Sequence, residues 1–150
     1  MPTPLPAPVQ DALDELSRAL AALTPSPVLG ALLYGGAAKG KVHTPSSDLN
    51  VLIVLADAAT AVLERLSAPL ALARRRAGAA PLIVAASELA AAAEAFPVKF
   101  HDIVKAHRLL AGRDPLEGLS IPPERLREDA RRGLTGLSLR LKRLYAARAD

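Results

Sequence analysis

The stretch that decides the fold is LLYGGAAKGKVHTPSSDLNVLIVL, residues 32–55 of a 150-residue chain. Residues 28–34 form a short apolar run that predicts a buried strand ending at Gly35 and Gly36. Residues 50–55 form a second apolar run, rich in β-branched side chains, which predicts another buried strand. The loop between them is rich in glycine, serine, threonine and lysine, and we expect a helix to begin just after the two glycines.

This loop offers the groups that a phosphate-binding site needs. Gly35 and Gly36 let the backbone approach an anion closely, and N–H groups at a helix start can bind it. Lys39 and Lys41 add positive charge, and Asp48 can hold a divalent cation that bridges phosphate oxygens. Plainer interpretations stay open, because the glycines can form only a tight turn and the acid can be an ordinary loop residue.

Hydrophobic periodicity predicts the other elements. We expect helices over residues 9–23, 57–76, 88–95, 103–111 and 123–148, and further strands over residues 81–86 and 96–102. Pro69 predicts a kink or an early break in the second helix. Together these elements predict an α/β (α+β) fold, with a small mixed sheet of about four strands and helices packed on it.

We divide the chain into three parts. Residues 1–8, with four prolines, are expected to form a flexible arm. Residues 9–112 form the α/β domain, and residues 113–150 form a C-terminal helical extension packed on it. The aliphatic stripe of the last helix can be part of the core or a surface for a homodimer or a helical partner protein.

The composition excludes several classes of site. The chain contains no cysteine, which excludes disulfides, thiolate zinc sites and cysteine nucleophiles. Only 3% of its residues are aromatic, too few for a platform that stacks nucleic-acid bases. No apolar run is long enough to span a membrane and no secretory signal is evident, so we expect a cytoplasmic protein without a membrane partner.

The net charge of +4 comes from the C-terminal third of the chain. Residues 1–100 carry eight basic and eight acidic side chains, whereas residues 101–150 carry eleven and seven. A basic final helix can contact nucleic-acid phosphates, but interspersed acids make a solvated helix face the favoured interpretation.

The glycine loop resembles the motif of a known family. One segment is similar to the motif of the nucleotidyltransferase superfamily, which has a polymerase-β-like fold. This segment consists of Gly35-Gly36, eleven further residues and then Asp48-Leu49-Asn50-Val51. The stretch FPVKFHDIVKAHRLLAGRDPLEGL resembles one in small bacterial nucleotidyltransferase-domain proteins, so the resemblance covers about residues 28–145.

The resemblance implies transfer of a nucleoside monophosphate from an NTP, with ATP as the expected nucleotide and Mg²⁺ as the cofactor, to an acceptor that the sequence does not identify. It implies that Gly35 and Gly36 seat the triphosphate, with accessory contacts from Lys39 and Ser47. Asp48 and Asn50 take the catalytic and metal-binding positions, and Asp102 is a candidate further metal ligand.

The sequence departs from the family motif at two points. Asn50 replaces the second carboxylate, so the geometry of the pair is kept while its charge falls by one. The expected strand at residues 81–86 carries no third acid, for which Asp102 or Glu88 would have to substitute. The alternative function is therefore a catalytically inactive module that binds a nucleotide or a partner.

Lys99 has two open interpretations: its side chain either faces the phosphates or is simply exposed to solvent.

Overall fold

The computed structural model describes residues 4–41 and 48–148. Its helices are α1 (Ala7–Ala21), α2 (Thr60–Ala77), α3 (Leu89–Ala95), α4 (Pro97–Lys105) and α5 (Pro123–Ala146), with a 3-10 turn, η1 (Ala86–Glu88), before α3. Its strands are β1 (Val28–Tyr34), β2 (Leu49–Leu55), β3 (Ala79–Ala85) and β4 (His107–Gly112). Within the described residues, no helix combines the length and the apolar character that crossing a membrane requires.

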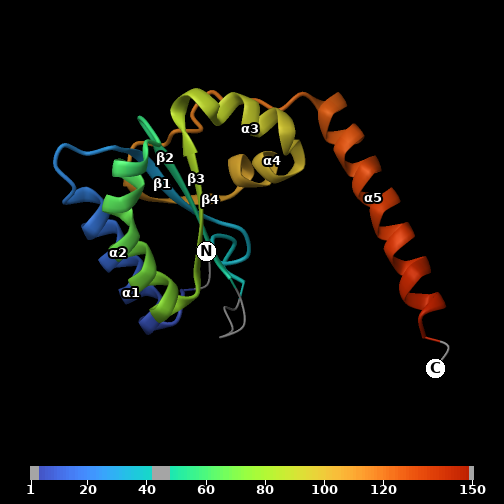
Figure 1. Cartoon of the computed structure of the whole chain (residues 1–150), viewed down its shortest axis with the longest axis horizontal. Coiled ribbons are helices and arrows are strands. Elements are labelled where there is room, and N and C mark those ends of the chain that lie inside the picture. Colours follow the sequence, from blue (N-terminus) through green and yellow to red (C-terminus); the bar gives the residue numbers. More distant parts are fainter. Residues whose placement is uncertain (1–3, 42–47, 149–150) are drawn as a thin grey trace.

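The four strands form one mixed sheet in the order β3-β2-β1-β4, which confirms the expected fold class (Figure 1). The central strand β1 pairs antiparallel with both β2 and β4, while β2 and β3 are parallel. Parallel strands need a crossover connection, and α2 provides it. Pro81 lies in β3, an edge strand, where the missing N–H group of proline is tolerated.

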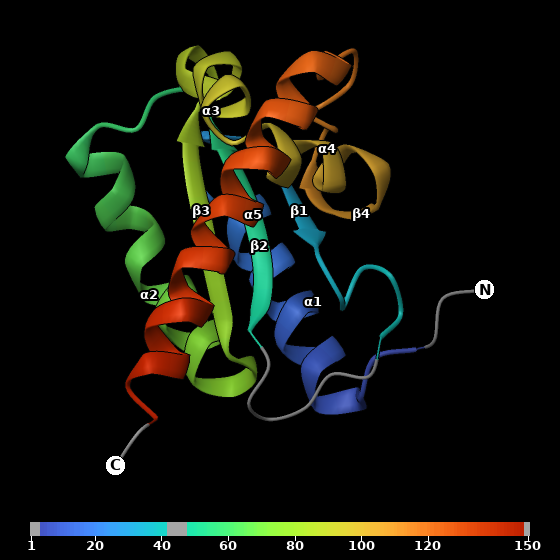
Figure 2. The same ribbon diagram turned by 90° about the vertical axis from the view of Figure 1, so that its right-hand side faces the viewer.

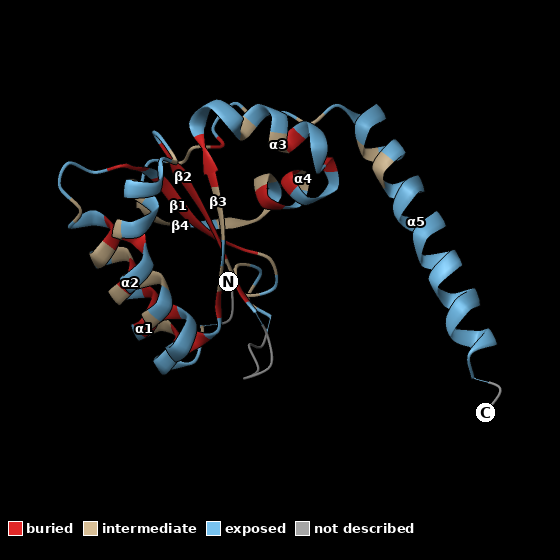
Figure 3. Cartoon of the chain, viewed as in Figure 1, coloured by how far each residue is buried: buried red, intermediate tan, exposed pale blue. Residues whose placement is uncertain are grey.

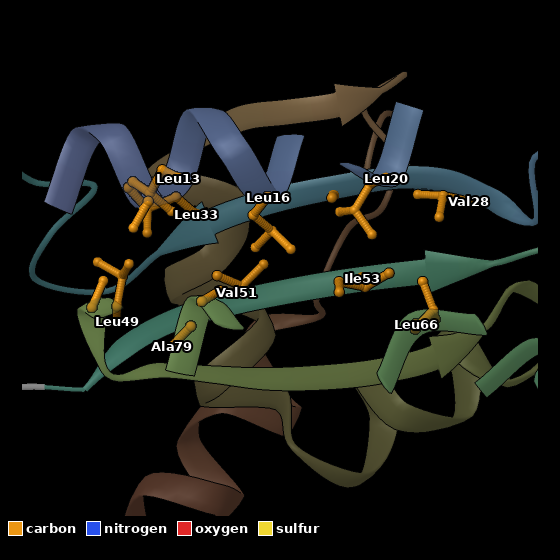
Figure 4. Packing of buried hydrophobic residues seen from close by; sticks show 14 of the residues in the cluster. Leu13, Leu16, Leu20, Val28, Leu33, Leu49, Val51, Ile53, Leu66 and Ala79 are labelled. Carbon is orange, nitrogen blue, oxygen red and sulfur yellow. The ribbon is translucent and has the colours of Figure 1, made fainter. Parts of the chain in front are cut away.

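Helices α1 and α2 cover one face of the sheet. Every third or fourth residue of α1 is buried, and these side chains meet the inward side chains of β1 and β2 (Figure 4). An ion pair between Glu15 and Arg76 joins the two helices at their surface. The principal members of this cluster are Leu13, Leu16, Leu20, Leu33, Val51, Ile53 and Leu66.

The other face of the sheet packs against α3, α4 and the segment after β4. Phe100 and Ile103 of α4 are each 1% exposed and contact the alternate set of strand side chains, including Leu52. The period-2 geometry of β2 places Asn50 on this same face, two residues before Leu52. The sheet therefore has two cores, and Asn50 belongs to the side that α4 covers.

The structure corrects the predictions for residues 96–111. The predicted strand over residues 96–102 is instead the start of α4, and the predicted helix over residues 103–111 overlaps β4. The alternation of Phe96, Val98 and Phe100 suggested a strand, but burial follows Pro97, Phe100 and Ile103, a helical spacing. Proline at the first turn of a helix loses no hydrogen bond, so it begins α4 rather than marking a sheet edge.

Helix α2 is not interrupted at Pro69, contrary to the expected early break. It continues to Ala77 and ends at Gly78, whose φ of 65° provides a left-handed C-cap. The N–H of Gly78 donates to the carbonyl oxygen of Arg74 at 2.9 Å, which closes the helix. This ending returns the chain to the sheet at the first residue of β3.

Helix α5 contacts the α/β body only near its start. The backbone N–H of Val98 in α4 donates to Asp129 Oδ2 at 3.4 Å, and Leu126 is half-buried. All of residues 131–148 are exposed, and α5 is pale blue in Figure 3 beyond the tan patch near its start. In Figure 2, α5 crosses in front of β2 and β3, but the side view of Figure 1 shows that it stands apart from them.

Candidate functional site

The two glycines form a series of turns at the end of β1. Gly35 has φ 78°, a conformation that side chains with a Cβ rarely adopt. The carbonyl oxygens of Gly35 and Gly36 accept hydrogen bonds from the N–H groups of Lys39 and Lys41 at 3.2 and 2.9 Å. Residues 36–40 are turns rather than the helix that we expected to follow the glycines. In the described part of this loop, an anion would therefore meet a turn and not a helix N-terminus.

The side chain of Asn50 lies directly over Gly35. A Cβ atom added to Gly35 would stand 3.2 Å from Asn50 Nδ2, tighter than nearly all real contacts. Gly36 is different, because an added Cβ would meet Lys41 at an ordinary 3.7 Å. The structure thus brings Gly35 and Asn50, two of the predicted site residues, into contact.

Asp48 immediately precedes β2 and is exposed. It lies two residues before Asn50, which is the second residue of β2. Lys39 and Lys41 are also exposed, at the end of the glycine turns. Ser47, predicted as an accessory phosphate contact, lies outside the described residues. The described neighbourhood of Gly35 therefore holds one acid, one amide and two lysines.

The two candidates for a third carboxylate lie on other elements of the fold. Asp102 is exposed on α4 and not near the end of a strand as expected. Glu88 has a structural role, since its Oε2 accepts a hydrogen bond from the N–H of Ala85 at 3.0 Å, where η1 begins. Among the described residues, no group of three acidic or histidine side chains is arranged to hold a metal ion.

A lysine from α4 reaches the end of β1. Lys99 Nζ lies 6.0 Å from the ring centroid of Tyr34, the residue before Gly35. Tyr34 is 9% exposed, and this burial raises the pKa of its phenol above the usual 10.0. Lys99 had two open interpretations from the sequence; it is exposed on α4, as one of them states, and a contact with phosphates stays a prediction. Its place on α4 was not predictable while residues 96–102 were interpreted as a strand.

His107 is a further polar residue at this end of the sheet. It pairs with Tyr34 across the β1–β4 ladder. Its Nδ1 lies 2.8 Å from the carbonyl oxygen of Ile103, and its Nε2 lies 3.0 Å from Asp114 Oδ2. Both partners are acceptors, so both contacts are hydrogen bonds only when the ring carries two protons. Asp114 also accepts from the N–H of Leu116 at 2.9 Å, so this cluster fixes the segment after β4.

The donor set at Asp48 and Asn50 fits one magnesium ion better than two. Mg²⁺ in nucleotide sites is held by one or two carboxylates together with phosphate oxygens and water. One carboxylate and one amide oxygen meet that need for a single ion that the nucleotide also ligates. Two ions would require more negative charge than the described residues supply here.

Comparisons with known proteins do not assign this chain to a family. No family model matches the chain, and no curated protein matches it either.

Proposed function

We propose that this chain is a nucleotidyltransferase-like protein that binds an Mg²⁺–NTP complex at the glycine turn after β1. The observation that carries the proposal is the contact of Gly35 with Asn50. Gly35 has a left-handed conformation that favours glycine, and it lies beside the amide of Asn50. The exposed carboxylate of Asp48 comes two residues before Asn50 in the chain.

Each residue has a distinct role in this proposal. Gly35 and Gly36 allow close approach of the triphosphate, and Lys39 contacts its phosphates. Asp48 holds the magnesium ion, with the Asn50 oxygen as a neutral second ligand. A free NTP carries about four negative charges and Asp48 one, and the magnesium ion together with Lys39 and Lys41 offsets four of these five. Transfer of the nucleoside monophosphate to an acceptor hydroxyl is the reaction proposed for this site.

A second candidate is a module that binds the nucleotide without transferring it. Two observations favour this alternative: Asn50 is uncharged, and Glu88 Oε2 is engaged by the N–H of Ala85. Among the described acids near Asp48, no group is then evident that would remove the proton of the acceptor hydroxyl. Binding is common to both candidates, and turnover separates them.

Binding is tested by titrating the full chain with ATP, with and without Mg²⁺, in an isothermal calorimeter. We expect Asp48→Asn, which keeps the shape and removes the charge, to weaken Mg²⁺-dependent binding about tenfold or more. Asp11→Asn is the matched control, because Asp11 is exposed on α1, on the opposite side of the sheet. Equal affinity in both variants would contradict the proposal.

Turnover is tested with labelled NTP by following pyrophosphate release. Release that is lost in Asp48→Asn supports the transferase. Binding without release supports the inactive module, and restoring the carboxylate in Asn50→Asp is then expected to increase the dependence of binding on Mg²⁺.

A further inference from the structure

The distal part of α5 exposes a stripe of leucines that nothing in the described chain covers. The exposed fractions of Leu134, Leu137, Leu141 and Leu144 are 68%, 57%, 64% and 53%. A shallow open surface lies against Leu141 and Leu144, and its other lining residues are Lys142 and Tyr145 of α5 and Arg148 just beyond the helix. Because no other element of the described chain borders it, another molecule would have to complete a pocket there. We call these four leucines the leucine stripe.

The spacing of the leucine stripe matches a helical partner. Its residues follow one another at intervals of three, four and three, as the apolar positions of a coiled coil do. At about 100° per residue, they lie within an arc of about 80°. Such a narrow leucine stripe is typical of a seam between two helices, whereas a helix that lies in a membrane surface buries a wider face. Tyr145 borders the stripe and is the one aromatic side chain of α5.

The charge of this region indicates what kind of helix fits. Residues 130–148 contain six basic side chains and no acidic one, namely Arg131, Arg132, Arg140, Lys142, Arg143 and Arg148. Arg131, Lys142 and Arg140 flank the leucine stripe on its two sides, where charges of a coiled coil select the partner. Two copies of residues 130–148 placed side by side would bring twelve positive charges together without an acid from the same stretch. An acidic helix would instead meet complementary charge along both flanks.

One glycine of α5, Gly133, allows close approach at the same place. A Cβ added to Gly133 or Gly136 would meet no atom within 4 Å. Gly133 lies beside the leucine stripe, so the backbone of a partner can approach α5 there without obstruction. A glycine within an exposed helix otherwise lowers its stability, by about 1 kcal/mol relative to alanine.

We infer that the distal part of α5, from Arg131 onward, is a docking helix for an acidic amphipathic helix of another protein. Leucines or other aliphatic residues of the partner pack against the leucine stripe, and its glutamates or aspartates pair with Arg131, Arg140 and Lys142. This inference does not depend on nucleotide binding, because the surface lies outside the residues around Gly35.

The test uses the full chain and a designed helical peptide of three heptads with leucines at the seam and glutamates on both flanks. Fluorescence anisotropy measures its binding. We expect it to bind at least tenfold more tightly than a peptide with lysines on the flanks, and to weaken as salt is raised. A scrambled peptide of the same acidic composition controls for simple attraction between opposite charges.

Two exposed leucines provide a matched pair of variants. Leu141 belongs to the leucine stripe, whereas Leu139, 61% exposed, lies on the opposite side of the helix. We expect Leu141→Ser to weaken binding of the acidic peptide about tenfold or more and Leu139→Ser to leave it within about twofold. Because both side chains are exposed, unchanged circular dichroism is expected for both variants.

Several results would overturn the inference. Equal binding of the acidic, basic and scrambled peptides, or no binding, would remove the evidence for an acidic helical partner. Equal effects of Leu141→Ser and Leu139→Ser would mean that binding depends on charge and not on the leucine stripe, as expected for a nucleic acid. Dimers in sedimentation that Leu141→Ser abolishes would assign the stripe to a second copy. Co-sedimentation with phosphatidylglycerol vesicles that exceeds peptide binding would assign it to a membrane surface.

Discussion

Leucine side chains have opposite environments in the α/β body and in distal α5. Leu52 of β2 is 0% exposed between the sheet and α4, whereas Leu141 of α5 is 64% exposed. Both belong to regular apolar patterns in the sequence. The difference teaches that a pattern determines which face of an element is apolar, but the neighbouring elements determine whether that face is buried. Leucines in the body therefore stabilise the fold, and those of distal α5 are available for binding.

The largest expected difference between the regions is in stability. Leu52→Ala should lower the free energy of unfolding by about 2–5 kcal/mol, because it removes buried atoms and leaves a cavity. Leu141→Ala should change it by less than about 0.5 kcal/mol. Urea denaturation of both variants measures the contrast. Similar losses in the two variants would mean that distal α5 is packed in solution.

A smaller loss is expected at the polar cluster that holds the end of the body. His107→Ala removes contacts to the Ile103 carbonyl and to Asp114, and it leaves partly buried acceptors without their donor. The expected decrease in the free energy of unfolding is about 1–3 kcal/mol. Thermal unfolding followed by circular dichroism measures it. An unchanged melting temperature would show that the cluster does not fix the segment after β4.

The glycine pair allows a matched test within the candidate site. Gly35→Ala should cost about 1–2 kcal/mol of stability, because φ is 78° and the new Cβ would crowd Asn50 Nδ2. It should also weaken ATP binding, whereas Gly36→Ala should do little to stability, since its Cβ has ordinary space. Denaturation and calorimetry of both variants measure these effects. Equal effects of the two substitutions would contradict the special role of Gly35.

The smallest expected effect is a dependence of stability on alkaline pH. Burial raises the pKa of Tyr34, so the folded protein retains the phenol proton at a pH where the unfolded chain has lost it. The stability associated with neutral Tyr34 is present below the unfolded pKa of about 10 and is lost as the pH rises through the folded value. Urea titrations between pH 9 and 11 should show a steeper decline for the wild type than for Tyr34→Phe. Parallel declines would contradict this assignment.

Much of the α/β body could be predicted from local sequence. Apolar runs with β-branched residues identified β1 and β2, and the leucine spacing of residues 9–23 identified α1. The predictions for residues 96–111 were wrong. Residues 96–102, which include Pro97 and Phe100, fit the two-residue period of a strand as well as the period of a helix. Only packing against Leu52 and its neighbours decides between the two.

The candidate site was predictable in its residue types and less so in its arrangement. The sequence predicted that a strand ends at Gly35 and Gly36, but the position of Asn50 beside Gly35 depends on the β1–β2 register. The proximity of Lys99 to Tyr34 depends on α4, which the sequence did not predict. The roles of Asp48, Asn50 and Asp102 stay predictions, and Ser47 lies outside the described residues.

The central claim is that Mg²⁺–ATP binds at the glycine turn and not on the basic helix. The most direct measurement is a titration of ¹⁵N-labelled full chain with Mg²⁺–ATP, followed by the backbone amide signals in two-dimensional NMR. We predict saturable shifts of the Gly35, Gly36 and Asn50 signals, with the signals of residues 131–148 unchanged. Shifts confined to residues 131–148, or no shifts at all, would contradict the claim.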